Sequence, residues 1–121
     1  MFKRIAIVNR GEAAMRLIHA VREMNAEWRD AEPITTIALY TDGETSAMFA
    51  READEAYPLG PASERPYLNH DLLAKVLTEA RADAVWVGWG FVAEDPAFAD
   101  LVESLGITFI GPSGEAMRKL G

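Results

Sequence analysis

Cysteine is absent from the chain, which excludes disulfides, zinc thiolate sites and cysteine nucleophiles. A chain without cysteine fits a reducing cytosol. Histidine occurs only at His19 and His70, too few for a histidine metal cluster, and we expect no metal site in this segment.

Positive charge and long apolar runs are also scarce. Twelve Lys and Arg residues stand against nineteen Asp and Glu, and the net charge of -7 opposes binding to nucleic acid or to an anionic membrane surface. The apolar run after Arg4 is too short for a signal peptide, and no segment approaches the roughly 18 apolar residues that span a bilayer. We therefore expect a cytoplasmic protein without nucleic-acid or membrane partners.

Short β-rich runs alternate with segments of helical period along the chain. This alternation is typical of βαβ units around a parallel sheet. Half of the residues are hydrophobic, enough for one core in one domain. We predict a three-layer α/β sandwich with a mainly parallel sheet of about five strands, whose order cannot be read from sequence. The expected strands are 4–9, 35–41, 56–59, 84–87 and 107–110, with Pro58 indicating an edge strand.

Capping residues place the helices between these strands. We expect a helix from about Gly11, followed by an exposed connection over 25–33. Ser46, Asn69 and Asp95 are predicted N-caps, and Gly106 a left-handed helix stop. The expected buried stripes are Ala14, Leu17, Ile18 and Val21 in the first helix, and Leu72, Leu73, Val76 and Leu77 in a later one. A last helical segment over 115–120 looks cut off by the chain end.

Ligands of open parallel sheets bind beyond the carboxyl ends of the strands. Among the connections there, Gly88-Trp89-Gly90 is the most unusual, because two glycines permit close backbone approach beside a flat indole. The alternative is that Trp89 simply packs, as we expect of Trp86 in the strand. The connection 9–12 has one glycine instead of GxGxxG, and Glu12 would repel a phosphate, so we expect no nucleotide there.

The remaining polar residues suggest no catalytic group. Asp42 fits a turn, and the helix face with Arg16, His19 and Glu23 has the composition of a solvated surface. The residues themselves therefore indicate a cytosolic α/β domain with one unusual aromatic loop.

Five sequence blocks, in order, resemble those of biotin carboxylases. IAIVNRGEAAMR at 5–16 is similar to the family's opening ANRGEIALR, and ITFIGPS at 107–113 matches its ITFIGPS block. Between them, ADEA at 53–56, GPA at 60–62 with YLN at 67–69, and GWGFVAE at 88–94 resemble ADEAV, IGPAP…SYLN and GYGFLSE. The blocks cover nearly the whole chain.

The resemblance implies that residues 1–121 are a Rossmann-like domain preceding an ATP-grasp domain, with ATP-grasp and C-terminal domains expected downstream. The whole unit would be an ATP-dependent ligase that uses Mg²⁺ or Mn²⁺ to activate bicarbonate and carboxylate biotin. That reaction is the first half of an acyl-CoA or pyruvate carboxylase. Carrier and carboxyltransferase domains or subunits are the implied partners, and the isolated chain is expected to be inactive and to bind none of these cofactors firmly.

Two groups of residues match positions with a role in the family. Gly88, Trp89 and Gly90 correspond to the loop that borders biotin. Arg16 and Glu23 match homodimer contacts of bacterial biotin carboxylases, whereas His19 stands where those often have Arg. These residues would position biotin or a second copy of the chain, and none is assigned as catalytic.

The chain departs from the family motifs at several places. Trp86-Val87 replaces His-Pro, Trp89 replaces Tyr, Asp95 replaces Asn, and the 25–33 connection is longer than usual. These differences indicate a divergent branch, such as a large multidomain acyl-CoA carboxylase. Two alternatives stay open: a free-standing small-molecule binding module, and an assembly domain that docks subunits through the Arg16 face.

Overall fold

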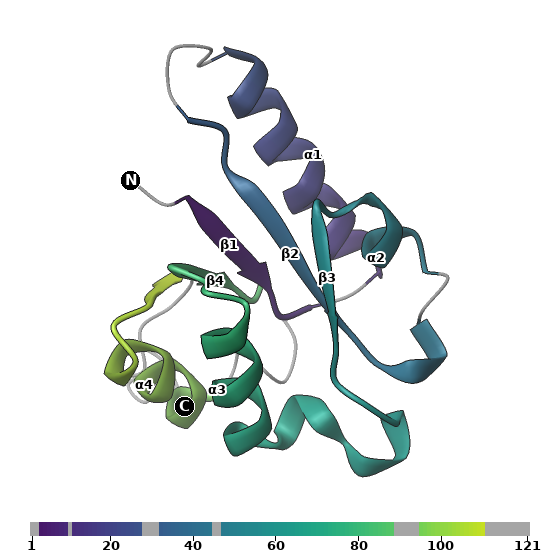
Figure 1. The fold of residues 1–121 in the computed structure, drawn as a ribbon, viewed down its shortest axis with the longest axis vertical. Helices are drawn as coiled ribbons and strands as arrows, with labels where there is room; N and C mark the ends of the chain where they lie inside the picture. The colour runs from purple at the N-terminus through teal and green to yellow at the C-terminus, as the bar shows by residue number, and fades with distance from the viewer. Residues whose placement is uncertain (1–2, 10, 28–31, 45–46, 89–94, 111–121) are drawn as a thin grey trace.

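The computed structural model describes residues 3–9, 11–27, 32–44, 47–88 and 95–110 (Figure 1). Five strands form one sheet in the order β3-β2-β1-β4-β5, and every neighbouring pair is parallel. The strands are β1 (Arg4–Ile7), β2 (Thr35–Tyr40), β3 (Glu55–Pro58), β4 (Ala84–Trp86) and β5 (Thr108–Ile110). The predicted strands are confirmed, with bounds that differ by one or two residues. Pro58 lies on edge strand β3, as expected.

Helices cover both faces of this sheet. They are α1 (Gly11–Glu27), α2 (Met48–Glu52), α3 (His70–Glu79) and α4 (Pro96–Ser104), with short 3-10 turns at Asp42–Glu44, Ala62–Glu64 and Pro66–Leu68. Figure 1 shows α1 and α2 on one side of the sheet and α3 and α4 on the other. The three-layer α/β prediction is confirmed.

The core has two halves because successive side chains of a strand point to opposite faces of the sheet. Ala6 and Val8 of the β1 segment pack in the half that contains α3 and α4. Ile5 and Ile7 point the other way, toward α1. The α3 and α4 half also buries Leu73, Leu77, Phe98 and Val102. Continuously apolar strands are what a doubly covered sheet requires.

The helix signals in the sequence are largely confirmed. The Asn69 side chain accepts from Leu72 N at 3.1 Å, and Asp95 Oδ1 accepts from Ala97 N at 3.0 Å, so both are N-caps. Gly106 has a positive φ of +77° two residues after α4. Within the predicted stripes, Leu17 and Leu72 are only partly buried. Ser46 and the predicted segment 115–120 lie outside the described residues, and the N-cap position of α2 is Ala47.

The strand order creates a switch point between β1 and β4. From β1 the chain moves outward through β2 to β3, and it then crosses back to place β4 on the other side of β1. The connections that follow β1 and β4 therefore lead to opposite faces of the sheet. Ligands of open α/β sheets bind at such a switch point, beyond the carboxyl ends of the strands.

Candidate functional site

The carboxyl ends of β1 and β4 lie side by side at the switch point. Val8 N donates to Trp86 O at 2.9 Å, which continues the β1–β4 pairing past the end of β1. One residue further, Asn9 Nδ2 donates to Val87 O at 2.7 Å. Here a side-chain amide takes the place of a backbone donor, so the segments that follow β1 and β4 stay hydrogen-bonded where they begin to diverge.

Gly88 follows directly and has a conformation that favours glycine. Its φ is +63°, and a Cβ built on it would lie 2.8 Å from Trp86 Cη2 and 3.0 Å from Asn9 Nδ2. The close neighbours of Gly88 in the structure are the protein's own Trp86 and Asn9. Trp86 is half-buried and packs against the α1 half of the core. Trp89 and Gly90, the other residues of the predicted biotin loop, lie outside the described residues.

The connection from β4 ends at Asp95, where a contact was not foreseen from the sequence. His70 Nε2, at the start of α3, lies 2.8 Å from Asp95 Oδ2. The two residues are 25 apart in sequence and meet only because α3 and α4 pack side by side on one face (Figure 1). The N-cap pattern predicts Asp95 as a cap, but nothing in the local spacing indicates its second partner.

A shallow groove of about 520 Å³ lies beside the start of α1. It is lined by Gly11, Glu12, Met15, Glu44, Ala47, Met48 and Phe49. Glu44 is held in place, because its Oε1 accepts from Thr41 N and Thr41 Oγ1 at 3.0 and 2.9 Å. The predicted turn at Asp42 is confirmed as part of the same 3-10 turn. The carboxylates of Glu12 and Glu44 are therefore both among the residues that line this groove.

The predicted dimer residues share the exposed face of α1. Arg16, His19 and Glu23 are all exposed, and Arg16 Nη2 forms an ion pair with Glu12 Oε1 at 2.8 Å, one helical turn away. On the same helix, Arg22 Nη2 donates to Glu52 of α2 at 2.9 Å, and this hydrogen bond lowers the pKa of Glu52. The structure therefore leaves the three predicted residues accessible and does not test the dimer.

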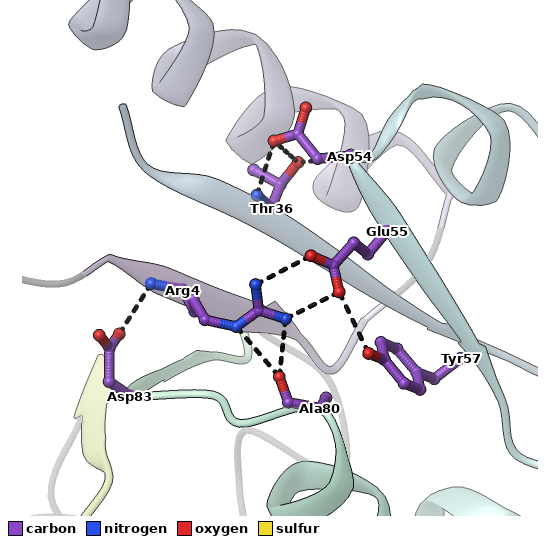
Figure 2. A network of polar contacts seen from close by, with 7 residues as sticks. All are labelled: Arg4, Thr36, Asp54, Glu55, Tyr57, Ala80 and Asp83. Atoms are coloured by element: carbon purple, nitrogen blue, oxygen red, sulfur yellow. Dashed lines mark hydrogen bonds and ion pairs between the residues drawn. The ribbon is translucent and has the colours of Figure 1, made fainter. Parts of the chain in front are cut away.

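A network of partly buried polar side chains at the amino end of the sheet was not predicted from the sequence (Figure 2). Arg4 donates to both carboxylate oxygens of Glu55 at 2.7 and 2.8 Å, and twice to Ala80 O, at the end of α3. Asp83 accepts from Arg4 N at 3.0 Å, and Tyr57 donates to Glu55 at 3.1 Å. The hydrogen bond between Arg4 and Glu55 lowers the pKa of Glu55 and raises the pKa of Arg4. This network joins β1, β3 and α3 away from the switch point, so we interpret it as structural.

The described residues contain neither a metal cluster nor a membrane-spanning helix. Within these ranges, no group of three or more His, Cys, Asp or Glu side chains could hold a metal ion. No helix in the same part of the chain is long and apolar enough to cross a membrane.

The topology is that of a Rossmann-like parallel α/β domain, and its candidate site is the switch point between β1 and β4. The family model described as "Biotin carboxylase, N-terminal domain" matches residues 1–117. The chain therefore belongs to the family of biotin carboxylase N-terminal domains.

Known relatives and structures agree with this assignment. The chain is 40% identical to "Biotin carboxylase 1" of Bacillus subtilis over 100% of this chain and 25% of that protein. It is 38% identical to a pyruvate carboxylase subunit of Methanothermobacter thermautotrophicus, covering 100% of this chain and 23% of the relative. The biotin carboxylase of Campylobacter jejuni superposes with a TM-score of 0.85 at 34% identity, over 98% of this chain and 25% of that chain. The chain thus spans about a quarter of the length of these relatives.

Proposed function

We propose that this chain is the N-terminal domain of an ATP-dependent biotin carboxylase, which carboxylates biotin with bicarbonate. In this proposal the reaction is the first half of an acyl-CoA or pyruvate carboxylase, and the chain alone is inactive. The observation that carries the proposal is the match of the family model to residues 1–117. Relatives named biotin carboxylase and pyruvate carboxylase, aligned over the whole chain, support it.

ATP, Mg²⁺ or Mn²⁺, and bicarbonate belong, in this proposal, to the ATP-grasp and C-terminal domains expected downstream. A structure of the Hydrogenobacter thermophilus 2-oxoglutarate carboxylase biotin carboxylase domain, 39% identical with a TM-score of 0.83, is a dimer in complex with MgADP, ADP and bicarbonate. The residues described in our chain offer no cluster of metal ligands, and the groove beside α1 has two carboxylates in its lining. In this proposal these residues therefore hold neither the nucleotide nor the metal.

The role left to this domain is to position biotin. In the proposal, Trp89 places its flat indole beside the bicyclic ring, while Gly88 and Gly90 let the backbone approach it. Holding a reactant in place lowers the entropy loss of the reaction without activating any group. Gly88, the first residue of this loop, lies against Trp86 and Asn9 at the switch point, and this location supports the role.

The test is bicarbonate-dependent carboxylation of free biotin by the full-length gene product and by the 121-residue chain. We expect activity only in the longer protein, and in that protein Trp89→Ala should lower kcat/KM for biotin about ten-fold, the loss of roughly one aromatic contact. Inactivity of both proteins, from a gene that encodes no more than this chain, would instead support a free-standing binding module.

Contact between two copies of the protein through α1 is the second proposed role, favoured by the exposure of Arg16, His19 and Glu23. We expect Arg16→Glu in the full-length protein to shift the mass measured by light scattering from dimer toward monomer, because the reversed charge would face an unchanged partner. Lys75→Glu, at an exposed position of α3, is the matched control. An unchanged mass for Arg16→Glu would remove this face from the interface. Contacts with carrier and carboxyltransferase partners, and a cytoplasmic location, remain predictions.

A further inference from the structure

The groove beside α1 combines an apolar lining with two carboxylates. Phe49 lines it with a side chain that is only 2% exposed, and Met15 and Met48 line it from α1 and α2. Met48 is 62% exposed, more than any other large hydrophobic side chain in the described part of the chain. A large apolar side chain this exposed, next to an apolar groove, is typical of a surface that binds a partner.

Both walls of the groove belong to one packed unit. Phe49 of α2 packs in the same core cluster as Ala14 and Ile18 of α1. Arg22 of α1 also donates to Glu52 of α2 at 2.9 Å. Because the two helices are joined in this way, the groove is already formed, and a partner can bind without first separating them.

The charged side chains in the described lining of the groove are Glu12 and Glu44. Oε1 of Glu44 is fixed by its contacts with Thr41, and Tyr67 Oη also donates to it, at 3.3 Å. Glu12 pairs with Arg16, but the two side chains are 80% and 64% exposed, so this ion pair is weak and can exchange its cation. Together with the net charge of -7, the two carboxylates favour a cationic partner.

The shallow shape of the groove distinguishes between kinds of partner. Sites for small molecules are clefts that enclose most of the ligand surface. A shallow apolar groove instead suits one or two side chains presented by another polypeptide, as when a helix binds in a groove. Methionine side chains adapt to different apolar shapes, so Met15 and Met48 can pack against such a side chain.

We propose that the groove between α1 and α2 is a docking site for a basic, apolar segment of another protein. One apolar side chain of the segment packs on Met48 and Phe49, and flanking Lys or Arg side chains meet Glu12 and Glu44. The site follows the carboxyl ends of β1 and β2, on the face of the sheet that α1 and α2 cover. Such docking requires only the groove, and it occurs whether or not the protein carboxylates biotin.

The test measures the binding of fluorescent peptides of about twelve residues to the full-length protein by anisotropy. One series places a central Leu, Met or Phe between Lys and Arg residues, and a matched series has Glu at each basic position. We expect the basic series to bind, and the acidic series to bind at least about ten-fold more weakly, because like charges repel across an interface. Equal binding of the two series, or no binding of either, overturns the inference.

Single substitutions locate the site. Met48→Gln should weaken the best basic peptide about five-fold through the loss of apolar contact, whereas Leu68→Gln, at a 53% exposed position outside the groove, should change Kd by less than about two-fold. Glu12→Gln should weaken binding about three-fold at low ionic strength, and Glu103→Gln, at an exposed position of α4, should not. Unchanged affinity in both Met48→Gln and Glu12→Gln overturns the inference. Both positions are exposed, so neither variant should unfold the protein.

A second copy of the protein is the alternative occupant of the groove, and light scattering distinguishes it. We expect Met48→Gln to leave the mass of the full-length protein unchanged, because the groove binds a different polypeptide. A lower mass for Met48→Gln than for wild type would show that the groove joins two copies, and would overturn the assignment of a basic partner.

Discussion

Replacing Gly88 with alanine is expected to lower the free energy of unfolding by about 3 kcal/mol. Two costs add up here. A residue with a Cβ at a φ of +63° costs about 1 kcal/mol, and forcing that Cβ against the Trp86 ring and the Asn9 amide costs about 2 kcal/mol more. Neither neighbour can move freely, because Asn9 is hydrogen-bonded to Val87 O and Trp86 packs against the core. Urea denaturation measures the loss.

Gly11 provides the matched control for this substitution. Its φ is +65°, nearly that of Gly88, but a Cβ built on it meets nothing within 4 Å. Gly11→Ala should therefore cost only the conformational term of about 1 kcal/mol. Equal losses for the two variants would show that the contact between Gly88, Trp86 and Asn9 has no energetic role. The comparison separates backbone conformation from steric exclusion at the floor of the candidate site.

Removing the Arg4 side chain is the second large perturbation, with an expected loss of about 2 to 3 kcal/mol in the free energy of unfolding. Arg4→Ala eliminates the two-point contact with Glu55 and leaves that carboxylate, which is two-thirds buried, without its cation. It also removes both hydrogen bonds to Ala80 O at the end of α3, where a positive charge is favourable. Arg22→Ala is the control, because its ion pair with Glu52 joins side chains that are 50% and 44% exposed and should contribute less than about 1 kcal/mol.

The stability lost in Arg4→Ala should become smaller as the pH falls. The hydrogen bond from Arg4 lowers the pKa of Glu55 in the folded state, assisted by Tyr57 and opposed by burial. A lowered folded pKa stabilises the fold above the unfolded value of about 4.3, and this stabilisation is lost as the pH falls through the folded pKa. The difference in urea midpoint between wild type and Arg4→Ala should therefore narrow below about pH 4. The stability contributed by the hydrogen bonds from Arg4 to Ala80 O should not change with pH. If the difference in urea midpoint stayed constant with pH, the whole stability loss of Arg4→Ala would come from these bonds to the Ala80 carbonyl.

The local elements of the fold were predictable because their signals lie within a few residues. Asn69 and Asp95 cap the helices they precede, and Gly106 takes the left-handed conformation expected of a helix stop. The apolar runs predicted strands covered on both faces, and Pro58 indicated the edge. In each case one or two neighbouring side chains decide the backbone conformation.

The long-range arrangement could not be obtained in this way. Strand order depends on how the crossovers return, and hence the switch point between β1 and β4 appears only in the structure. The Arg4 side chain meets a residue 51 positions away, and His70 meets one 25 positions away. No periodicity links such positions. The sequence indicated the glycine at position 88, but not that Trp86 and Asn9 are the groups that exclude a side chain there.

The proline at the edge of the sheet has a consequence for self-association. Leu59 N donates inward to Tyr40 O, so the nitrogen of the preceding residue, Pro58, faces away from β2. A proline nitrogen has no hydrogen to donate, so the outer edge of β3 is short and lacks a backbone donor at Pro58. Another strand cannot add to this edge with a continuous ladder of backbone hydrogen bonds. A second molecule that binds on this side has to be recognised by side chains, and uncontrolled growth of the sheet from β3 is blocked.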